Sequence, residues 1–176
     1  PRPAPGGGGG ASPRAGPAEE KPPPIRSAAH REGLWHWVNQ GVPDVIGSDH
    51  APHTIEEKAK TYPASPSGMP GVQTLVPLFL NHVAEGRLTL QRFIDMTSAG
   101  PQRIFGLVGK GRIALGYDAD FTVVDLKKRW SPFEGDMLTG KAIGTIIRGH
   151  RVMWEDTLSN DAIGEPVRFE ATEFRS

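Results

Sequence analysis

The order of apolar patterns in this chain of 176 residues predicts an α/β fold: the last strand and helices of a TIM-like (β/α)8 barrel, followed by a small β-sandwich-type layer. Two observations lead to this prediction. A short apolar run at 42–48 lies between two segments with helical periodicity, as a strand does in a β/α unit. After Gly106 the apolar period changes from 3.6 to 2, which is typical of β-structure. A whole barrel takes about 250 residues, so only part of one is expected.

Helical periodicity recurs before Gly106. Ser27 and Thr89 are suitable N-caps, because their side-chain oxygens accept hydrogen bonds from N–H groups of the first turn. Gly86 is suited to end the second helix, and Gly100-Pro101 is expected to end the third. The predicted helices are 27–40, 72–85, 89–98 and a single turn at 102–105.

Period-2 patterns predict strands in the rest of the chain. Two of them, 111–116 and 120–125, flank a Gly-Tyr-Asp turn, and 144–148 pairs with 151–155 in a hairpin through Gly149-His150. Low apolar content at both ends predicts disorder there. The expected divisions are a disordered Pro/Gly-rich segment 1–22, the barrel part 23–106, the β layer 107–156 and a fraying tail 157–176.

The composition argues against several classes of function. The 20 Lys+Arg and 20 Asp+Glu give a formal net charge of zero, so we expect no binding to nucleic acid or an anionic membrane. The absence of cysteine excludes disulfides, thiolate zinc sites and a cysteine nucleophile. No apolar stretch reaches the roughly 20 residues of a membrane span. We therefore expect a soluble, cytoplasmic protein, and the start at Pro1 indicates a piece of something longer.

The segment directly after 42–48 holds the strongest candidates for chemistry. Asp49 and His53 are four positions apart, at the end of a strand where barrel enzymes place their catalytic groups, and Pro52 keeps them out of a helix. Taken singly, an Asp after a strand is more often an Asx turn or a cap, and a loop histidine is usually a surface residue. The glycines in 67–71 favour a function, because they let the backbone approach a ligand closely.

The sequence reads IGSDHAPHT at 46–54, PSGMPGVQT at 66–74, TSAGP at 97–101 and RIFGL at 103–107. Together these motifs resemble those of the class I dihydroorotases, within the cyclic amidohydrolases. The stretch 111–125 is similar to the β segment that closes amidohydrolases generally. The Asp-His-Ala-Pro-His string is more discriminating, because hydantoinases and allantoinases usually depart from it. The resemblance covers roughly 23–154, the C-terminal third or so of such an enzyme.

The resemblance implies the reversible closure of carbamoyl aspartate to dihydroorotate, a step of de novo pyrimidine synthesis that uses zinc. Asp49 matches the aspartate that ligates the metal and moves a proton between the water and the ring nitrogen. His53 matches the histidine that binds the substrate carboxylate. Ser67 and Gly68 match the loop pair whose backbone meets the ring, and Arg26 matches an arginine that enters the site from the previous strand.

The family's other metal ligands, a His-x-His pair, a carboxylated lysine and two further histidines, have no counterparts here. His30 and His36 fall on a predicted helix, and Pro22 replaces a substrate-binding asparagine. Asp49 alone does not hold zinc, since such sites need three or more protein ligands. Three interpretations remain: an incomplete dihydroorotase that is inactive alone, a non-catalytic dihydroorotase-like interaction subunit, and an allantoinase- or hydantoinase-like cyclic amidase. The expected partners are a small-molecule substrate and either a homo-oligomer or a transcarbamoylase.

Overall fold

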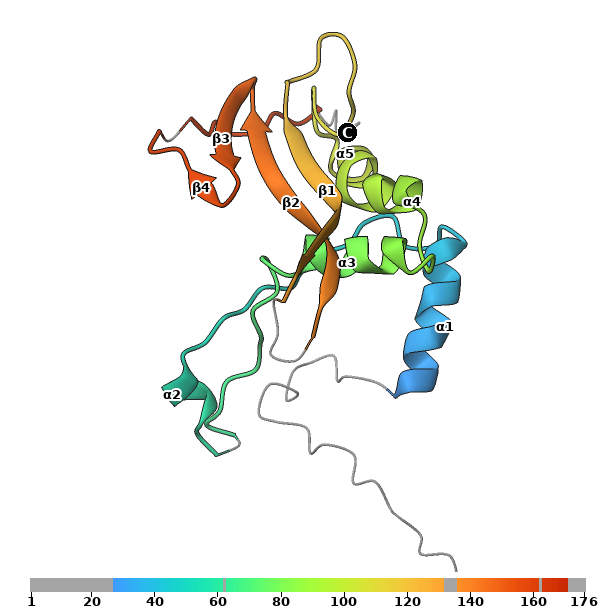
Figure 1. Cartoon of the computed structure of the whole chain (residues 1–176), viewed down its shortest axis with the longest axis vertical. Helices are drawn as coiled ribbons and strands as arrows, with labels where there is room; N and C mark the ends of the chain where they lie inside the picture. Colours follow the sequence, from blue (N-terminus) through green and yellow to red (C-terminus); the bar gives the residue numbers. More distant parts are fainter. Residues whose placement is uncertain (1–26, 62, 132–135, 162, 171–176) are drawn as a thin grey trace, which may run out of the picture. The chain divides into compact units, whose positions relative to one another are not determined.

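The computed structural model describes residues 27–61, 63–131, 136–161 and 163–170 (Figure 1). The segment 1–22 and Arg26, about which the sequence makes predictions, lie outside this part of the chain. Among the described residues, Asp49–Pro70 belong to one compact unit, and Ser27–Ser48 with the residues from Gly71 onward belong to another. The expected boundaries at 23, 107 and 157 therefore stay predictions.

The helices of the larger unit follow the apolar periodicity. The predictions for 27–40 and 72–85 are confirmed, although the second helix begins three residues later than expected. Thr89 caps its helix as predicted, because its hydroxyl accepts a hydrogen bond of 3.1 Å from the Arg92 N–H. The helical elements are α1 (Ala28–Asn39), α3 (Leu75–Ala84), α4 (Leu90–Ile94), the π-helix η2 (Asp95–Ala99) and α5 (Gly100–Phe105).

The third helix does not end before Gly100-Pro101, so that expectation is wrong. It passes through η2 and continues as α5, where Gly106 in the left-handed region (φ 60°) ends it. In the π-helical turn the Gly100 N–H donates to the carbonyl of Asp95, five residues earlier. Pro101 then stands at the start of α5, where its missing N–H removes no necessary hydrogen bond.

The strand expected at 42–48 is not formed. A strand needs a neighbour for its ladder, and none of the described strands lies beside this segment. Its backbone instead forms hydrogen bonds with residues of α4 and η2. The Ile46 N–H donates to the Met96 carbonyl at 3.3 Å, and the Arg92 guanidinium donates to the carbonyls of Val38 (2.9 Å) and Pro43.

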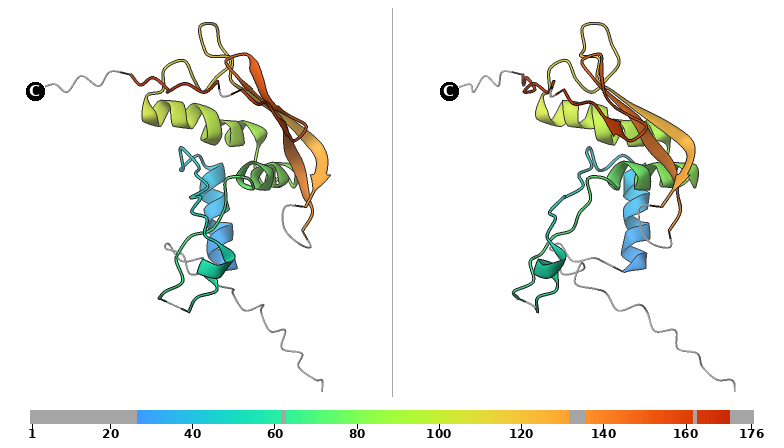
Figure 2. Two further views of the ribbon diagram at one scale, coloured as in Figure 1. Left: turned by 90° about the vertical axis from the view of Figure 1, so that its left-hand side faces the viewer. Right: turned by 60° about the vertical axis from the view of Figure 1, so that its left-hand side comes forward.

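The later part of the chain forms one four-stranded antiparallel sheet, in the order β1-β2-β3-β4. Its strands are β1 (Phe121–Trp130), β2 (Leu138–Ile147), β3 (His150–Trp154) and β4 (Thr157–Leu158). The prediction of strands at 120–125, 144–148 and 151–155 is confirmed. The hairpin turn lies at Arg148-Gly149, one residue earlier than expected, where both residues have positive φ. Figure 2 shows helices on one face of this sheet.

The strand expected at 111–116 is also wrong, since these residues form bends and a turn. An ion-pair network explains this structure. The Lys110 ammonium contacts both Asp118 (2.9 Å) and Asp120, and the Asp120 carboxylate accepts a hydrogen bond of 2.7 Å from the Arg148 N–H. The network closes the segment into a loop and attaches it to the β2–β3 turn, so no edge is available for a ladder.

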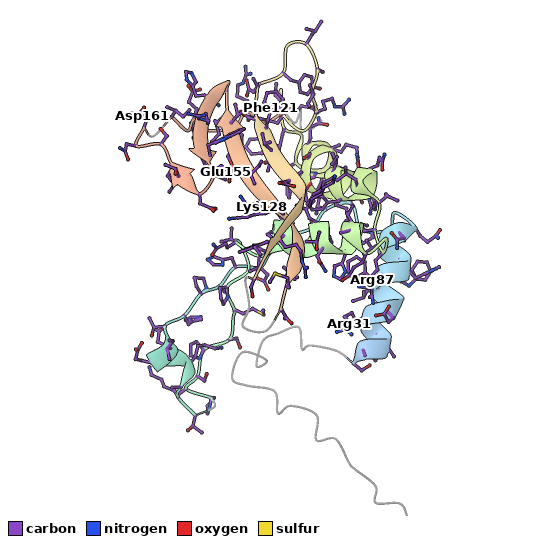
Figure 3. All side chains as sticks on the ribbon, in the orientation of Figure 1. Arg31, Arg87, Phe121, Lys128, Glu155 and Asp161 are labelled. Carbon is purple, nitrogen blue, oxygen red and sulfur yellow. The ribbon has the colours of Figure 1, made fainter. Side chains whose placement is uncertain are left out.

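The core lies between the helices and the sheet. It consists of the buried side chains Leu80, Leu88, Phe93 and Met96. The rings of Phe79 and Phe93 stack at 5.9 Å. Arg87, labelled beside α1 in Figure 3, donates to Glu32 at 3.2 Å. None of the described helices is both long and apolar enough to cross a membrane.

Candidate active site

The motif segment Asp49–Pro70 folds around one helical turn, α2 (Ile55–Lys58). Thr54 and Glu57 form a capping box: the Thr54 hydroxyl accepts from the Glu57 N–H at 3.2 Å, and the Glu57 carboxylate accepts from the Thr54 N–H at 3.0 Å. The Thr54 N–H and then the His53 ring, both hydrogen-bonded to the Glu57 carboxylate, lower the pKa of Glu57. This short helix therefore has a defined start despite its length.

Two limbs of the segment, 49–53 and 66–70, run side by side. The Ala51 N–H donates to the Met69 carbonyl at 3.1 Å, and His50 and Met69 form a parallel bridge. Gly68 has φ 118°, and a Cβ placed there would lie 2.6 Å from the Ala51 carbonyl oxygen. Only glycine fits this position, because any side chain would meet both backbone strain and the opposite limb.

Asp49 stands at the corner where the first limb begins. Its φ of 47° is in the left-handed region, which aspartate tolerates better than most residues. The residue is exposed. Non-glycine residues in this region often mark functional sites, where the surrounding structure imposes the conformation. Asp49 thus begins the motif loop at an exposed position.

His53 is held by the helix that follows it. Its Nδ1 lies 3.3 Å from Oε2 of Glu57, and 30% of its side chain is exposed. When Nδ1 carries a proton it donates to Glu57, and Nε2 is then the remaining ring nitrogen, which donates to a ligand only when it carries a proton as well. The capping box therefore fixes the Glu57 carboxylate, and this carboxylate orients the imidazole.

Lys58 connects α2 to the second limb. Its ammonium donates to the carbonyls of Pro66 (2.7 Å) and Gly68 (3.2 Å), on either side of Ser67. The buried Ser65 hydroxyl donates to the main-chain carbonyl of Lys58 at 3.3 Å. Lys58 is thus joined to residues 65–68 through both its side chain and its backbone.

A concavity of about 360 Å³ opens inside this segment. It lies between His53, Ile55 and Lys58 on one side and Gly68, Met69 and Pro70 on the other. The volume is near the lower end for small-molecule sites. The fold therefore brings together two of the residues singled out in the sequence, His53 and Gly68. Ser67 is exposed next to them, whereas Asp49 does not line the concavity.

The described residues do not fit a zinc ion on their own. They hold no group of three or more His, Asp or Glu side chains placed to bind a metal. His30 and His36 lie on α1, as expected from the sequence, and the His30 ring contacts the Ser27 hydroxyl at 2.8 Å. Asp49 is the only expected ligand in the described part of the chain.

Glu57 and Lys58 are not among the candidate residues that the sequence predicted. The Thr-x-x-Glu pattern at 54–57 is a capping-box signature that would have predicted the fixed Glu57. No comparable signal exists for Lys58, because its carbonyl partners lie 8 and 10 residues further along the chain.

Comparison with known families decides the assignment. The model of the amidohydrolase family matches residues 19–152. The chain belongs to the amidohydrolase family. Dihydroorotases are among its relatives: that of Pyrococcus furiosus is 42% identical over 158 residues, covering 82% of this chain and 36% of the relative. The dihydroorotase of Halobacterium salinarum is 41% identical over 150 residues, covering 78% and 35% respectively.

Solved structures agree with this membership. The L-hydantoinase from Arthrobacter aurescens superposes with a TM-score of 0.76 and 31% identity, over 82% of this chain and 36% of the hydantoinase. The D-hydantoinase from a Thermus species gives a TM-score of 0.75 and 28% identity, over 82% and 36%. The chain thus spans about a third of the length of the relatives it matches.

Proposed function

We propose that this chain forms the C-terminal part of a dihydroorotase, which interconverts carbamoyl aspartate and dihydroorotate in pyrimidine synthesis. The observation that carries the proposal is the motif loop. His53 and Ser67–Gly68 are separated by the 13 residues 54–66, yet they belong to one unit, in which His53 and Gly68 line the same concavity. The identity of about 40% to dihydroorotases supports this choice of substrate.

Each residue has a role in the proposal. Asp49 is the general acid/base that carries a proton between the attacking water and the ring nitrogen, a task for which its exposed carboxylate is suited. His53 acts as the imidazolium: its Nδ1–H donates to Glu57, and its Nε2–H donates to the carboxylate of the substrate. The backbone of Ser67 and Gly68 meets the amide edge of the ring, and Arg26 adds a second cation.

The proposal includes a barrel completed from outside the described residues. Segment 42–48 then becomes its last strand, with neighbours on both sides. The exposed Leu34 and Trp37 of α1, 62% and 54% accessible, are covered by the adjoining barrel wall. Zinc, which the family resemblance implies, takes Asp49 as one ligand only if the other ligands come from that completing part.

A complementation assay tests the proposal. The chain is fused behind the N-terminal part of the Pyrococcus furiosus dihydroorotase that it does not cover, and dihydroorotate turnover is compared with that of the isolated chain. We expect turnover by the fusion and none above buffer by the isolated chain. A folded, metal-loaded fusion without turnover would contradict the proposal.

Two other functions have one supporting observation each. The lack of a metal-binding group in the described residues favours a non-catalytic subunit, whose partner would be a second copy or a transcarbamoylase. A complex with purified transcarbamoylase, together with an inactive fusion, would select this function.

The hydantoinase structures favour another cyclic amidase. Turnover of hydantoin or allantoin in place of dihydroorotate would select that function.

A further inference from the structure

We propose that Lys58 is a positioning residue for the substrate, because it fixes the backbone that the substrate meets; the inference rests on the proposed function. The ammonium of Lys58 reaches the two carbonyls that flank Ser67, at 2.7 Å to Pro66 and 3.2 Å to Gly68. Hydrogen bonds from a charged donor are stronger than neutral ones, so this pair of contacts is well suited to hold a loop.

Because the peptide bond is planar, a hydrogen bond that fixes a carbonyl group also fixes the direction of the next N–H group. In a trans peptide the C=O and the next N–H lie on opposite sides. Fixing the Pro66 carbonyl toward Lys58 therefore directs the Ser67 N–H away from it. Fixing the Gly68 carbonyl directs the Met69 N–H in the same way. Lys58 thus holds the peptide groups on both sides of the Ser67–Gly68 peptide, and its effect on the substrate acts through this backbone.

Other contacts hold the residues on both sides of the Lys58 hydrogen bonds. The second limb is already held at one end by the Ala51 N–H to Met69 carbonyl bond, and Gly68 is pressed against Ala51. The hydroxyl of Ser65, 6% exposed, anchors the Lys58 main chain to the same limb. The Lys58 ammonium holds the other end through the Pro66 and Gly68 carbonyls, so the loop already has its conformation before a ligand binds.

Amide exchange in the ligand-free, full-length chain tests the clamp directly. Lys58→Met keeps the length of the side chain and removes its donors. We expect the Ala51 amide, which is bonded across the limbs, to exchange roughly tenfold faster or more, because a charged hydrogen bond contributes at least that factor to an equilibrium. Lys60→Met is the matched control, and it should leave Ala51 exchange unchanged. Unchanged exchange in Lys58→Met would overturn the inference.

Kinetics of the active fusion separate positioning from a merely structural role. Lys58→Met should raise KM for dihydroorotate about tenfold while kcat changes less than about threefold, and Lys58→Arg should restore KM because its guanidinium also reaches two carbonyls. A raised KM with normal Ala51 exchange would identify Lys58 as a direct ligand and overturn the positioning role. Faster Ala51 exchange with a normal KM would also overturn it, because the clamp would then have no effect on substrate binding. A fusion that is inactive with Lys58 in place contradicts the proposed function. Amide exchange in the ligand-free chain then tests by itself whether Lys58 holds the loop.

Discussion

Gly100→Ala tests how the helix after α3 supports the segment that leads to the motif loop. Gly100 is buried, and a Cβ there would lie inside van der Waals contact with the Asp44 carbonyl oxygen and 2.9 Å from that of Asp95. Both neighbours are backbone atoms, which do not rotate away. Overpacking of this kind costs about 1–3 kcal/mol. The better helix propensity of alanine offsets about 1 kcal/mol of this, since Gly100 has an ordinary helical φ of −61°.

We therefore expect Gly100→Ala to lower the free energy of unfolding by up to about 2 kcal/mol. Gly33→Ala is the matched control, because Gly33 is an exposed helix residue with nothing within 4 Å of its added Cβ. It should raise the free energy of unfolding by about 0.5–1 kcal/mol. Urea unfolding followed by circular dichroism measures both. Equal stabilisation by the two substitutions would refute the packing of 42–48 against α5.

Three further predictions concern the core, the motif loop and the dependence on pH. Leu80→Ala, at a site 1% exposed, should lower the free energy of unfolding by about 2–5 kcal/mol in the same urea assay. Thr54→Ala removes the cap of α2 and should speed amide exchange at Glu57, whereas Thr157→Ala should not. Lys110→Met should flatten the loss of stability in acid. The Lys110 ammonium lowers the pKa of Asp118; burial raises the pKa of Asp120, but Lys110 and the Arg148 N–H outweigh burial and lower it. Both carboxylates therefore stabilise the fold above about pH 4 and lose this contribution as the pH falls through their folded pKa values. Unfolding midpoints from pH 7 to pH 3 that are parallel in Lys110→Met and the unmodified chain would contradict this.

Local patterns predicted what local interactions determine. The helices α1 and α3 and the β2–β3 hairpin follow from apolar periodicity and turn residues close in sequence. Segment 42–48 has the composition of a buried strand, but a ladder depends on a neighbour that its own residues do not specify. The 111–116 pattern failed because Lys110 binds two aspartates beyond it, which closes a loop instead of an edge.

The candidate site shows the same division. His53 and Gly68 were found from their motifs, and the fold brings both to one concavity. Lys58 was missed because its role depends on carbonyl groups, which every residue has and which no sequence pattern marks. Arg26 lies outside the described residues.

The central claim, that this chain supplies the acid/base residue of a dihydroorotase, is tested most directly by one rate. The measurement is kcat for dihydroorotate hydrolysis by the fusion carrying Asp49→Asn, with the unmodified fusion and Asp161→Asn as references. Asn keeps the size of the side chain and removes the proton acceptor, so the rate should fall by about 100-fold to 10,000-fold, while Asp161→Asn changes little. A fusion that keeps its full rate with Asp49→Asn would contradict the account.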